Sequence, residues 1–219
     1  LSREPRRVAD CVAAMRAAVS IPVTVKCRIG VDDQDPPVAL PALVEACANA
    51  GVDTFAVHAR KAWLSGLSPR ENREVPPLDY GLVYALKRAR PDLTIIINGG
   101  IASLDEAELH LAHVDGVMLG RAAYQTPAIL LDVDTRFFAG SRRDLSDGLA
   151  AYLDYVAERL ADGAPLNAMT KHLLGLFHGR PGARLFRRHL SENATRKGAD
   201  ISVLRDALAY IDRERAEAA

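Results

Sequence analysis

Hydrophobic and polar positions follow two different spacings along the first 140 residues. Short runs rich in β-branched residues predict strands that are buried on both faces, as in a parallel sheet. Between these runs, apolar residues recur every three to four positions, which predicts amphipathic helices. Ser103 and Glu106 have capping-box spacing, so one helix is expected to begin there. The predicted strands span 22–29, 52–58, 94–98 and 115–119, and the other predicted helices span 4–19, 38–50, 79–90 and 127–138.

This strict alternation of strand and helix predicts an α/β fold with a parallel sheet. Residues 22–138 contain four βα units, whereas a complete (β/α)8 barrel has eight and usually takes about 250 residues. We therefore interpret residues 1–140 as the C-terminal half of a (β/α)8 TIM barrel, the last four strands. A small open α/β sheet is the alternative. Because the chain opens at Leu1 with a helix rather than a strand, we expect it to be a fragment that lacks the first half of the barrel.

The pattern changes after Gly140, where only helical spacing is found. We predict a small all-α helical domain over residues 141–219. Its helices are marked by Leu149, Tyr152, Leu153, Val156 and Leu160; by Leu166, Met169, Leu173, Leu176 and Phe177; by Ala183, Phe186 and Leu190; and by Ile201, Leu204, Leu208 and Ile211.

Composition narrows the class of protein. The chain has 219 residues, 49% of them hydrophobic, and a formal net charge of zero, so any nucleic-acid surface must be a local basic patch. Cys11, Cys27 and Cys47 show neither metal-ligand spacing nor an even disulfide count, which fits a reducing compartment. We find no signal peptide and no apolar run of membrane-spanning length. We expect a cytoplasmic protein with no metal and no membrane partner.

Polar side chains mark the ends of the four predicted strands. Lys26 shares a strand face with Arg28 and is expected to point inward, near the carboxyl end where barrel active sites lie. His58 and Asn98 end the next two strands, and Arg121 follows the fourth. Four such groups on four consecutive strand ends favour one convergent site. Alternatively, Lys26 is a structural residue bonded to a carboxylate, and a lone histidine is usually structural.

Glycines accompany these strand ends. Gly99 and Gly100 follow the third predicted strand, and Gly120 precedes Arg121. Glycine lets the backbone approach a ligand and point an N–H at an anion, and arginine suits phosphate. A phosphate site is therefore favoured over the alternative that the glycines only make tight turns. Because side chains alternate between the two faces of a strand, Cys27 is expected on the face that meets the helices. We therefore interpret it as a small core residue and not as a nucleophile.

Two regions have local basic character. The predicted loop at 59–77 is too long for an ordinary connection and carries four basic residues around Trp63. Such a loop suits an RNA strand, but Trp63 packed down as an anchor is an equal alternative. In residues 166–198, seven basic residues oppose the single Glu192, which favours a polyanion partner. The loop cations are Arg60, Lys61, Arg70 and Arg73, and Arg184, Arg187 and Arg188 share a helix face.

In combination, these motifs resemble the tRNA-dihydrouridine synthases, over essentially the whole chain. They are VTVKCRIG at 23–30, HARKAWLSGLSP at 58–69, INGG at 97–100 and GR at 120–121. The segments ENRE at 71–74, PPLDY at 76–80, PGAR at 181–184 and LSENA at 190–194 resemble the A subgroup. The resemblance implies an FMN-binding (β/α)8 barrel followed by a helical tRNA-binding domain. It also implies reduction of uridine to 5,6-dihydrouridine in the D-loop of tRNA, around positions 20 and 20a, with NADPH as reductant.

The resemblance also implies roles for individual residues. FMN would be bound by Lys26, His58, Asn98, Gly99, Gly100, Gly120 and Arg121, and tRNA by Arg70, Arg73, Arg184 and Arg187. The family's proton-donating cysteine follows the fourth barrel strand in a Gly-Cys-Pro motif that is absent from this sequence, and Cys27 matches a position with no catalytic role. We therefore expect no catalytic residue in this chain and no activity from it alone.

Two other functions are weighed against this one. An FMN barrel oxidoreductase acting on a small pyrimidine-like substrate would have no use for the basic helical tail. A non-catalytic remnant that only binds tRNA is favoured if the barrel strands missing from this sequence are also missing from the protein. The intact protein is expected to be a monomer.

Overall fold

The structure is a computed structural model that describes residues 3–217, with side chains up to Ile211. It divides into two compact units between Gly120 and Arg121, and each unit is described by itself.

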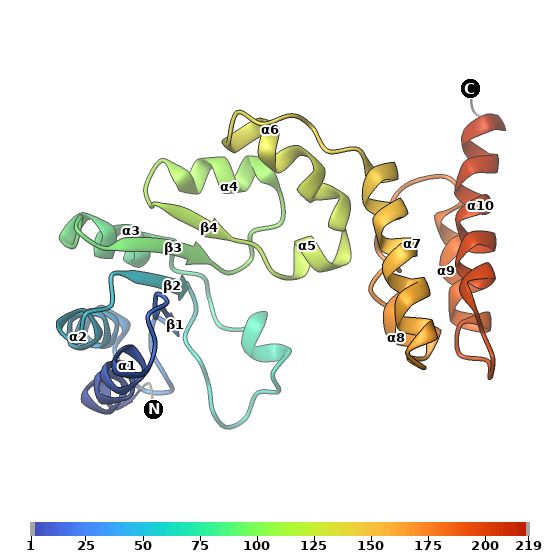
Figure 1. The fold of residues 1–219 in the computed structure, drawn as a ribbon. Coiled ribbons are helices and arrows are strands. Elements are labelled where there is room, and N and C mark those ends of the chain that lie inside the picture. Colours follow the sequence, from blue (N-terminus) through green and yellow to red (C-terminus); the bar gives the residue numbers. More distant parts are fainter. Residues whose placement is uncertain (1–2, 218–219) are drawn as a thin grey trace. The chain divides into compact units, whose positions relative to one another are not determined.

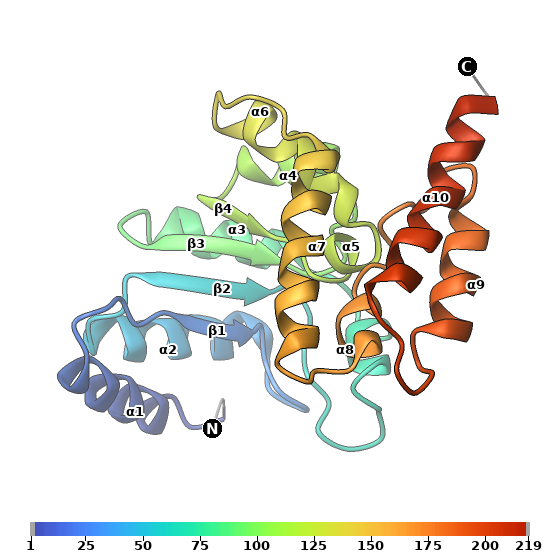
Figure 2. The same ribbon diagram turned by 45° about the vertical axis from the view of Figure 1, so that its right-hand side comes forward.

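A four-stranded parallel sheet forms the centre of the first unit (Figure 1). Its strands are β1 (Val25–Arg28), β2 (Thr54–His58), β3 (Thr94–Asn98) and β4 (Gly116–Met118). They pair in the order β1-β2-β3-β4, and all four point the same way, as Figure 2 shows. The prediction of a parallel α/β fold is therefore confirmed.

Helices α1 (Pro5–Ala18), α2 (Pro36–Asn49), α3 (Tyr80–Ala89) and α4 (Leu104–Leu111) accompany the sheet. Helix α1 packs on α2, α3 on β3 and α4 on β4. The predicted N-cap of α4 is present: Ser103 accepts a hydrogen bond from the backbone N–H of Glu106. The Glu106 carboxylate accepts one from Ala102, one residue earlier than a capping box requires.

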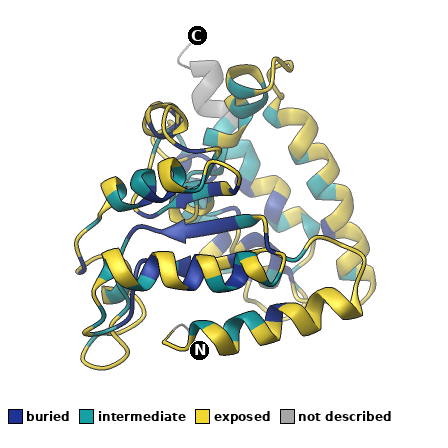
Figure 3. Cartoon of the chain, turned by 90° about the vertical axis from the view of Figure 1, so that its left-hand side faces the viewer, coloured by how far each residue is buried: buried dark blue, intermediate teal, exposed yellow. Residues whose placement is uncertain are grey.

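The two faces of the sheet differ as strand parity requires. In register, Cys27 pairs with Val57 and Val57 with Ile97, and all three are buried on one face. Figure 3 shows that buried positions concentrate on the strands and on the helix sides that face them. The opposite face carries Lys26 and Arg28 on β1. The predicted division of these residues between core and opposite face is thus confirmed.

The second unit is helical in its described residues. It begins with α5 (Arg121–Gln125), the 3-10 helix η2 (Pro127–Asp132) and α6 (Val133–Phe137). Helices α7 (Leu145–Ala161), α8 (Leu166–Thr170), α9 (Ala183–Asn193) and α10 (Ile201–Glu217) follow. Their shared core centres on Val156, Phe186 and Leu204, each at most 1% exposed.

Three details differ from the sequence-based expectation. The helix expected at 127–138 is a 3-10 helix followed by a short α-helix. The second tail helix stops at Thr170 and continues as turns with hydrogen bonds three residues apart, such as Leu173 N–H to the Thr170 carbonyl. The backbone approaches Gln125 closely in these turns, since a Cβ on Gly175 would lie 1.9 Å from the Gln125 carbonyl oxygen.

The division between the compact units also lies earlier than the predicted boundary near Gly140. Two exposed ion pairs connect residues 121–138 with the segment that follows them. Arg142 bonds Asp132 at 2.7 Å and Arg143 bonds Asp134 at 3.0 Å, so the segment that leads into α7 is tied to η2 and α6.

Candidate functional site at the strand ends

The carboxyl ends of the strands form a continuous row. In register, Arg28 pairs with His58, His58 with Asn98, and Asn98 with Met118. The Asn98 amide donates to the Met118 carbonyl at 2.7 Å, which ties the end of β3 to the end of β4. The structure thus brings together two predicted site residues, His58 and Asn98, and adds Arg28, which the sequence places only on the face of Lys26.

Lys26 lies two residues before this row, where its register partner is Ala56, and its side chain is exposed. In this structure Lys26 therefore bears no burial cost. Cys27 is buried, and burial, followed by the nearby Cys47 thiol, raises the pKa of Cys27 to about 12. A thiol with this pKa stays protonated at neutral pH, so Cys27 is a core residue, as predicted.

The turn after β3 is built around two glycines. Gly99 has φ +117° and Gly100 has φ +74°, a region that other residues rarely adopt. A Cβ on Gly99 would also lie 2.6 Å from Cδ2 of the buried His58 ring. One on Gly100 would lie 2.8 Å from Leu78. Backbone conformation therefore favours glycine at both positions, and at Gly99 packing against His58 adds to it, whether or not a ligand binds.

Gly120 is different. Its φ is not positive, it is exposed, and a Cβ added there would meet no atom within 4 Å. Neither backbone conformation nor packing requires glycine at this position. Close approach of a ligand to the backbone, the other property that glycine confers, accounts for this residue better than turn formation does.

Tyr80, the first residue of α3, fixes the turn after β3. Its hydroxyl donates to the Gly99 carbonyl at 2.7 Å, and its ring meets the buried His110 ring edge to face at 4.4 Å. The His110 Nδ1 lies 2.6 Å from the Tyr84 hydroxyl. Burial raises the pKa of both tyrosines and lowers that of His110, so at neutral pH the phenols keep their protons and the imidazole is neutral. Sequence reasoning missed these residues. The spacing of Tyr80 and Tyr84 on one helix face is the signal that could have found them.

The loop at 59–77 is held by arginines from two strand ends. The Arg28 guanidinium donates to the carbonyls of Lys61 at 2.8 Å and Asn72 at 2.7 Å. The Arg60 guanidinium donates to the carbonyls of Glu74 and Pro76. The loop contains one short 3-10 helix, η1 (Glu71–Arg73). Despite its length, the loop is therefore tied to the sheet at two backbone carbonyls through Arg28, and Arg60 joins its own two ends.

The predicted tRNA contacts lie in the two units. Arg70 is 81% exposed and lies 3.5 Å from Glu74, and Arg73 is exposed in η1. In the second unit, Arg184 is exposed on α9, and Arg187 is half-buried beside the face that carries Phe186 and Leu190. Arg121 begins α5 and is exposed. The Tyr124 hydroxyl on α5 lies 3.1 Å from His172 Nδ1 in the turns after α8.

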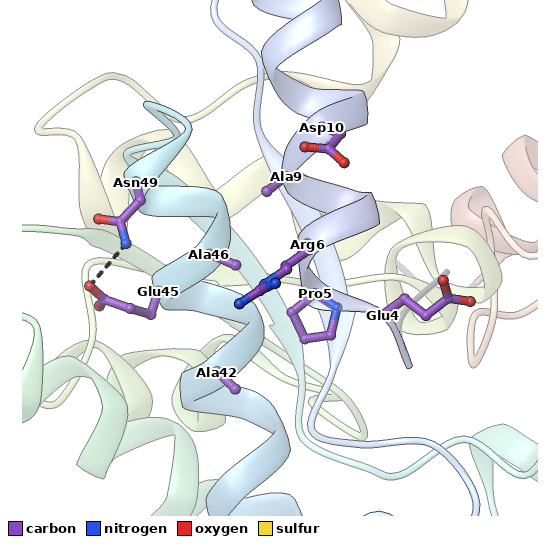
Figure 4. Close-up of a pocket in the computed structure, with 9 residues that line it drawn as sticks. All are labelled: Glu4, Pro5, Arg6, Ala9, Asp10, Ala42, Glu45, Ala46 and Asn49. Carbon is purple, nitrogen blue, oxygen red and sulfur yellow. Dashed lines mark hydrogen bonds between the residues drawn. The ribbon is translucent and has the colours of Figure 1, made fainter.

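A separate hollow of about 840 Å³ lies between α1 and α2 (Figure 4). Arg6 extends between the two helices, and Ala9, Ala42 and Ala46 line the hollow, which shares no residue with the strand-end row.

Among the residues that the structure describes, no cluster of three or more histidine, cysteine or acidic side chains could hold a metal ion. No helix over the same residues is long and apolar enough to cross a membrane.

Comparison with known proteins gives the family. The dihydrouridine synthase (Dus) family model matches residues 1–212. A tRNA-dihydrouridine(20/20a) synthase of Vibrio cholerae serotype O1 is 53% identical over 214 residues, which cover 96% of this chain and 65% of that protein. The synthase of the same name from Escherichia coli K12 is 56% identical over 212 residues, 95% of this chain and 61% of that protein.

The chain thus spans about two thirds of the length of these relatives. A solved structure of phosphoenolpyruvate phosphomutase from Streptomyces platensis subsp. rosaceus aligns with a TM-score of 0.42 and 17% identity, over 86% of this chain and 79% of that one. A likeness this weak supports no argument about function. The family model, which matches nearly the whole chain, shows that the chain belongs to the dihydrouridine synthase family.

Proposed function

We propose that the full-length protein containing this chain reduces a uridine in the D-loop of tRNA, at position 20 or 20a, to 5,6-dihydrouridine. The observation that carries the proposal is the row of polar strand ends in a member of the Dus family. The names of relatives more than 50% identical supply the substrate. The four strands in sequence order are then the last four of a (β/α)8 barrel, and the helical unit is the tRNA-binding domain.

FMN is the cofactor that we propose for this site. Its fit rests on Gly120, where an exposed backbone with open space beside it suits close approach of a phosphate. Arg121, the next residue in the sequence, has a guanidinium that suits the same anion. The turn at Gly99 and Gly100 is a second backbone segment that would bind the same phosphate. When bound, FMN would supply hydride transfer to the C5–C6 double bond of uracil, with NADPH as the source of electrons.

The remaining strand-end residues have roles that follow from their chemistry. Lys26, exposed on the face opposite the core, would add a positive charge that stabilises a reduced flavin. His58 is buried and can orient a uracil carbonyl or a flavin oxygen by hydrogen bonding. Asn98 keeps the ends of β3 and β4 together through its bond to Met118. Cys27 and Cys47 are buried thiols, so neither serves as the proton donor.

Contacts to tRNA are assigned to Arg70 and Arg73 in the loop and to Arg184 and Arg187 on α9. Guanidinium groups bind phosphate through paired N–H donors, and three of the four side chains are exposed. A remnant that only binds tRNA would use the same arginines but no flavin. An oxidoreductase acting on a small pyrimidine would use the strand ends but not α9.

Three assays on the full-length gene product separate these functions. The purified protein should carry a flavin spectrum, and with NADPH it should form dihydrouridine in an unmodified tRNA transcript, detected by mass spectrometry of the nucleosides. Free uridine should not be reduced. Arg121→Ala should lower flavin retention. Purified protein that binds tRNA without any flavin would establish the remnant, and turnover of free uridine would establish the small-molecule enzyme.

A further inference from the structure

Three consecutive residues in the loop, Ala62, Trp63 and Leu64, have unusually well-fixed backbones; we call them the braced segment. On one side they meet the end of β1, where Ala62 N–H donates to the Gly30 carbonyl at 2.9 Å and the Ala62 carbonyl accepts from Asp32 N–H at 2.7 Å. The Asp32 carboxylate also accepts from Leu64 N–H at 2.7 Å. The backbone of this segment is therefore tied to the sheet.

Asn72 braces the other side. Its side-chain carbonyl accepts from Trp63 N–H, and its amide donates to the Trp63 carbonyl, both at 2.7 Å. The backbone carbonyl of Asn72 is itself held by Arg28 at the end of β1. Asn72 therefore holds the Trp63 backbone through two hydrogen bonds, and Arg28 in turn links Asn72 to the strand-end row.

The side chains on this fixed backbone remain exposed. Trp63 is 41% exposed and Leu64 is 71% exposed. Hydrogen bonds to the backbone hold this loop, so its anchoring does not depend on burial of the Trp63 ring. An aromatic side chain held out on an ordered backbone loses little conformational entropy when it binds a partner, which is the property of an interface anchor.

One cation lies beside this tryptophan, and three more lie at the base of the loop. The Lys61 ammonium group lies 5.2 Å from the centre of the Trp63 ring. Burial and then the neighbouring charges of Arg60 and Arg73 lower the pKa of Arg28, which indicates that three guanidinium groups lie near one another at the base of the loop. A flat aromatic ring beside cations is the combination with which proteins hold single-stranded nucleic acid.

We propose that Trp63 and Lys61 form a stacking platform for an unpaired base of the tRNA substrate, with Lys61 attracting the phosphate of the same nucleotide. The identity of the RNA rests on the proposed function; the platform itself rests on the exposure, bracing and charge described above. Stacking on an indole is tolerant of base identity because every base has a π-face. The platform therefore contributes affinity and positioning, and it does not select the uridine.

The chain offers a direct probe, because Trp63 is its only tryptophan. In the full-length protein, the fluorescence that disappears in Trp63→Phe isolates the signal of this residue. Titration with unmodified tRNA should quench that signal, and acrylamide should quench it readily in the absence of tRNA. Shielding from acrylamide without RNA would mean that another part of the protein covers Trp63 and would overturn the proposal.

Affinity measurements give the second test. Trp63→Ala should weaken tRNA binding about 5- to 150-fold, the range that corresponds to the roughly 1–3 kcal/mol measured per stacked base. The slope of log affinity against log salt should stay unchanged, since this side chain binds no phosphate. Lys61→Ala should instead flatten that slope by roughly 0.7. Leu64→Ala is the matched control, because it removes an exposed apolar side chain from the same segment and should bind as the wild type does.

Trp63→Leu separates stacking from general apolar contact, because it keeps bulk but has no aromatic face. It should bind as weakly as Trp63→Ala. Binding of either variant within twofold of the wild type would overturn the platform. This result is distinct from failure of the proposed function, which would appear as wild-type protein that binds tRNA but forms no dihydrouridine.

Discussion

Replacing Tyr80 with phenylalanine tests how the turn after β3 is oriented. The Tyr80 hydroxyl holds the Gly99 carbonyl at 2.7 Å, and the following peptide bond is trans. In a trans peptide the carbonyl and the next N–H point in opposite directions, so this bond also sets the direction of the Gly100 N–H. That N–H is one of the donors proposed for the FMN phosphate. Tyr80 is therefore a positioning residue, and Tyr80→Phe should affect the phosphate more than the flavin ring.

The magnitude follows from the single bond that is removed. A typical intramolecular hydrogen bond contributes about 1 kcal/mol net, which corresponds to about fivefold in an equilibrium constant. The aromatic contact between ring 80 and His110 is kept, so the packing at 4.4 Å should survive. We expect FMN to bind about fivefold more weakly to Tyr80→Phe, while riboflavin, which has no phosphate, binds with unchanged affinity.

Quenching of flavin fluorescence during titration of the apoprotein measures both affinities. Tyr84→Phe is the matched control: it removes a hydroxyl from the same cluster, 2.6 Å from His110, but has no bond to Gly99. It should lower thermal stability without changing the preference for FMN over riboflavin. The orienting role of this hydroxyl would be refuted if Tyr80→Phe kept the wild-type preference for FMN over riboflavin. It would also be refuted if both tyrosine variants lost that preference equally.

Three further predictions concern other parts of the chain. Iodoacetamide at neutral pH should label the exposed Cys11 but not Cys27, whose pKa is raised to about 12 by burial. Peptide mass spectrometry measures the labelling. Labelled Cys27 in the absence of denaturant would contradict the packing of β1. Burial lowers the pKa of His110 below its usual 6.5, so the unfolded chain takes up the proton first. The contribution of neutral His110 to the free energy of unfolding should be complete above about pH 6.5 and fall as the pH drops from there toward its folded pKa, and urea denaturation of His110→Asn should show a smaller loss over that range. The double change of Arg184 and Arg187 to alanine should lower the slope of log tRNA affinity against log salt by roughly 0.7–0.9 for each phosphate that is no longer bound, with flavin content unchanged. A slope equal to that of the wild type would mean that this face of α9 is only solvated.

Local patterns were sufficient to predict the sheet. Runs such as Ile95 to Ile97 are recognisable because β-branched residues favour strands, although Ile96 is only half-buried on the face opposite the core. Parity then assigned Lys26 and Cys27 to opposite faces of β1, as observed. The pattern was insufficient after Thr170, where Leu173 and Leu176 keep helical spacing but lie in turns. The close approach of Gly175 to the Gln125 backbone in this region joins positions far apart in sequence.

The candidate site could be predicted only where it follows strand ends. His58 and Asn98 were found because parallel strands align their carboxyl ends. The bonds from Tyr80 to Gly99 and from Arg28 to Asn72 link residues on different elements, and no periodicity encodes them. Gly99 and Gly120 look alike in the sequence. Only the atoms around them show that one is required by packing and the other is not.

The order of the strands has a consequence for how the first unit folds. Each strand pairs with the strand next in sequence, so every pairing, such as Val25 with Phe55, closes a loop that contains a single helix. Loop-closure entropy grows slowly with length, and contacts of low sequence separation form fast. The sheet can therefore grow strand by strand during synthesis, with each finished βα unit templating the next. A substitution that weakens β2 should delay both β1 and β3, whereas one in β4 should leave the earlier pairings free to form.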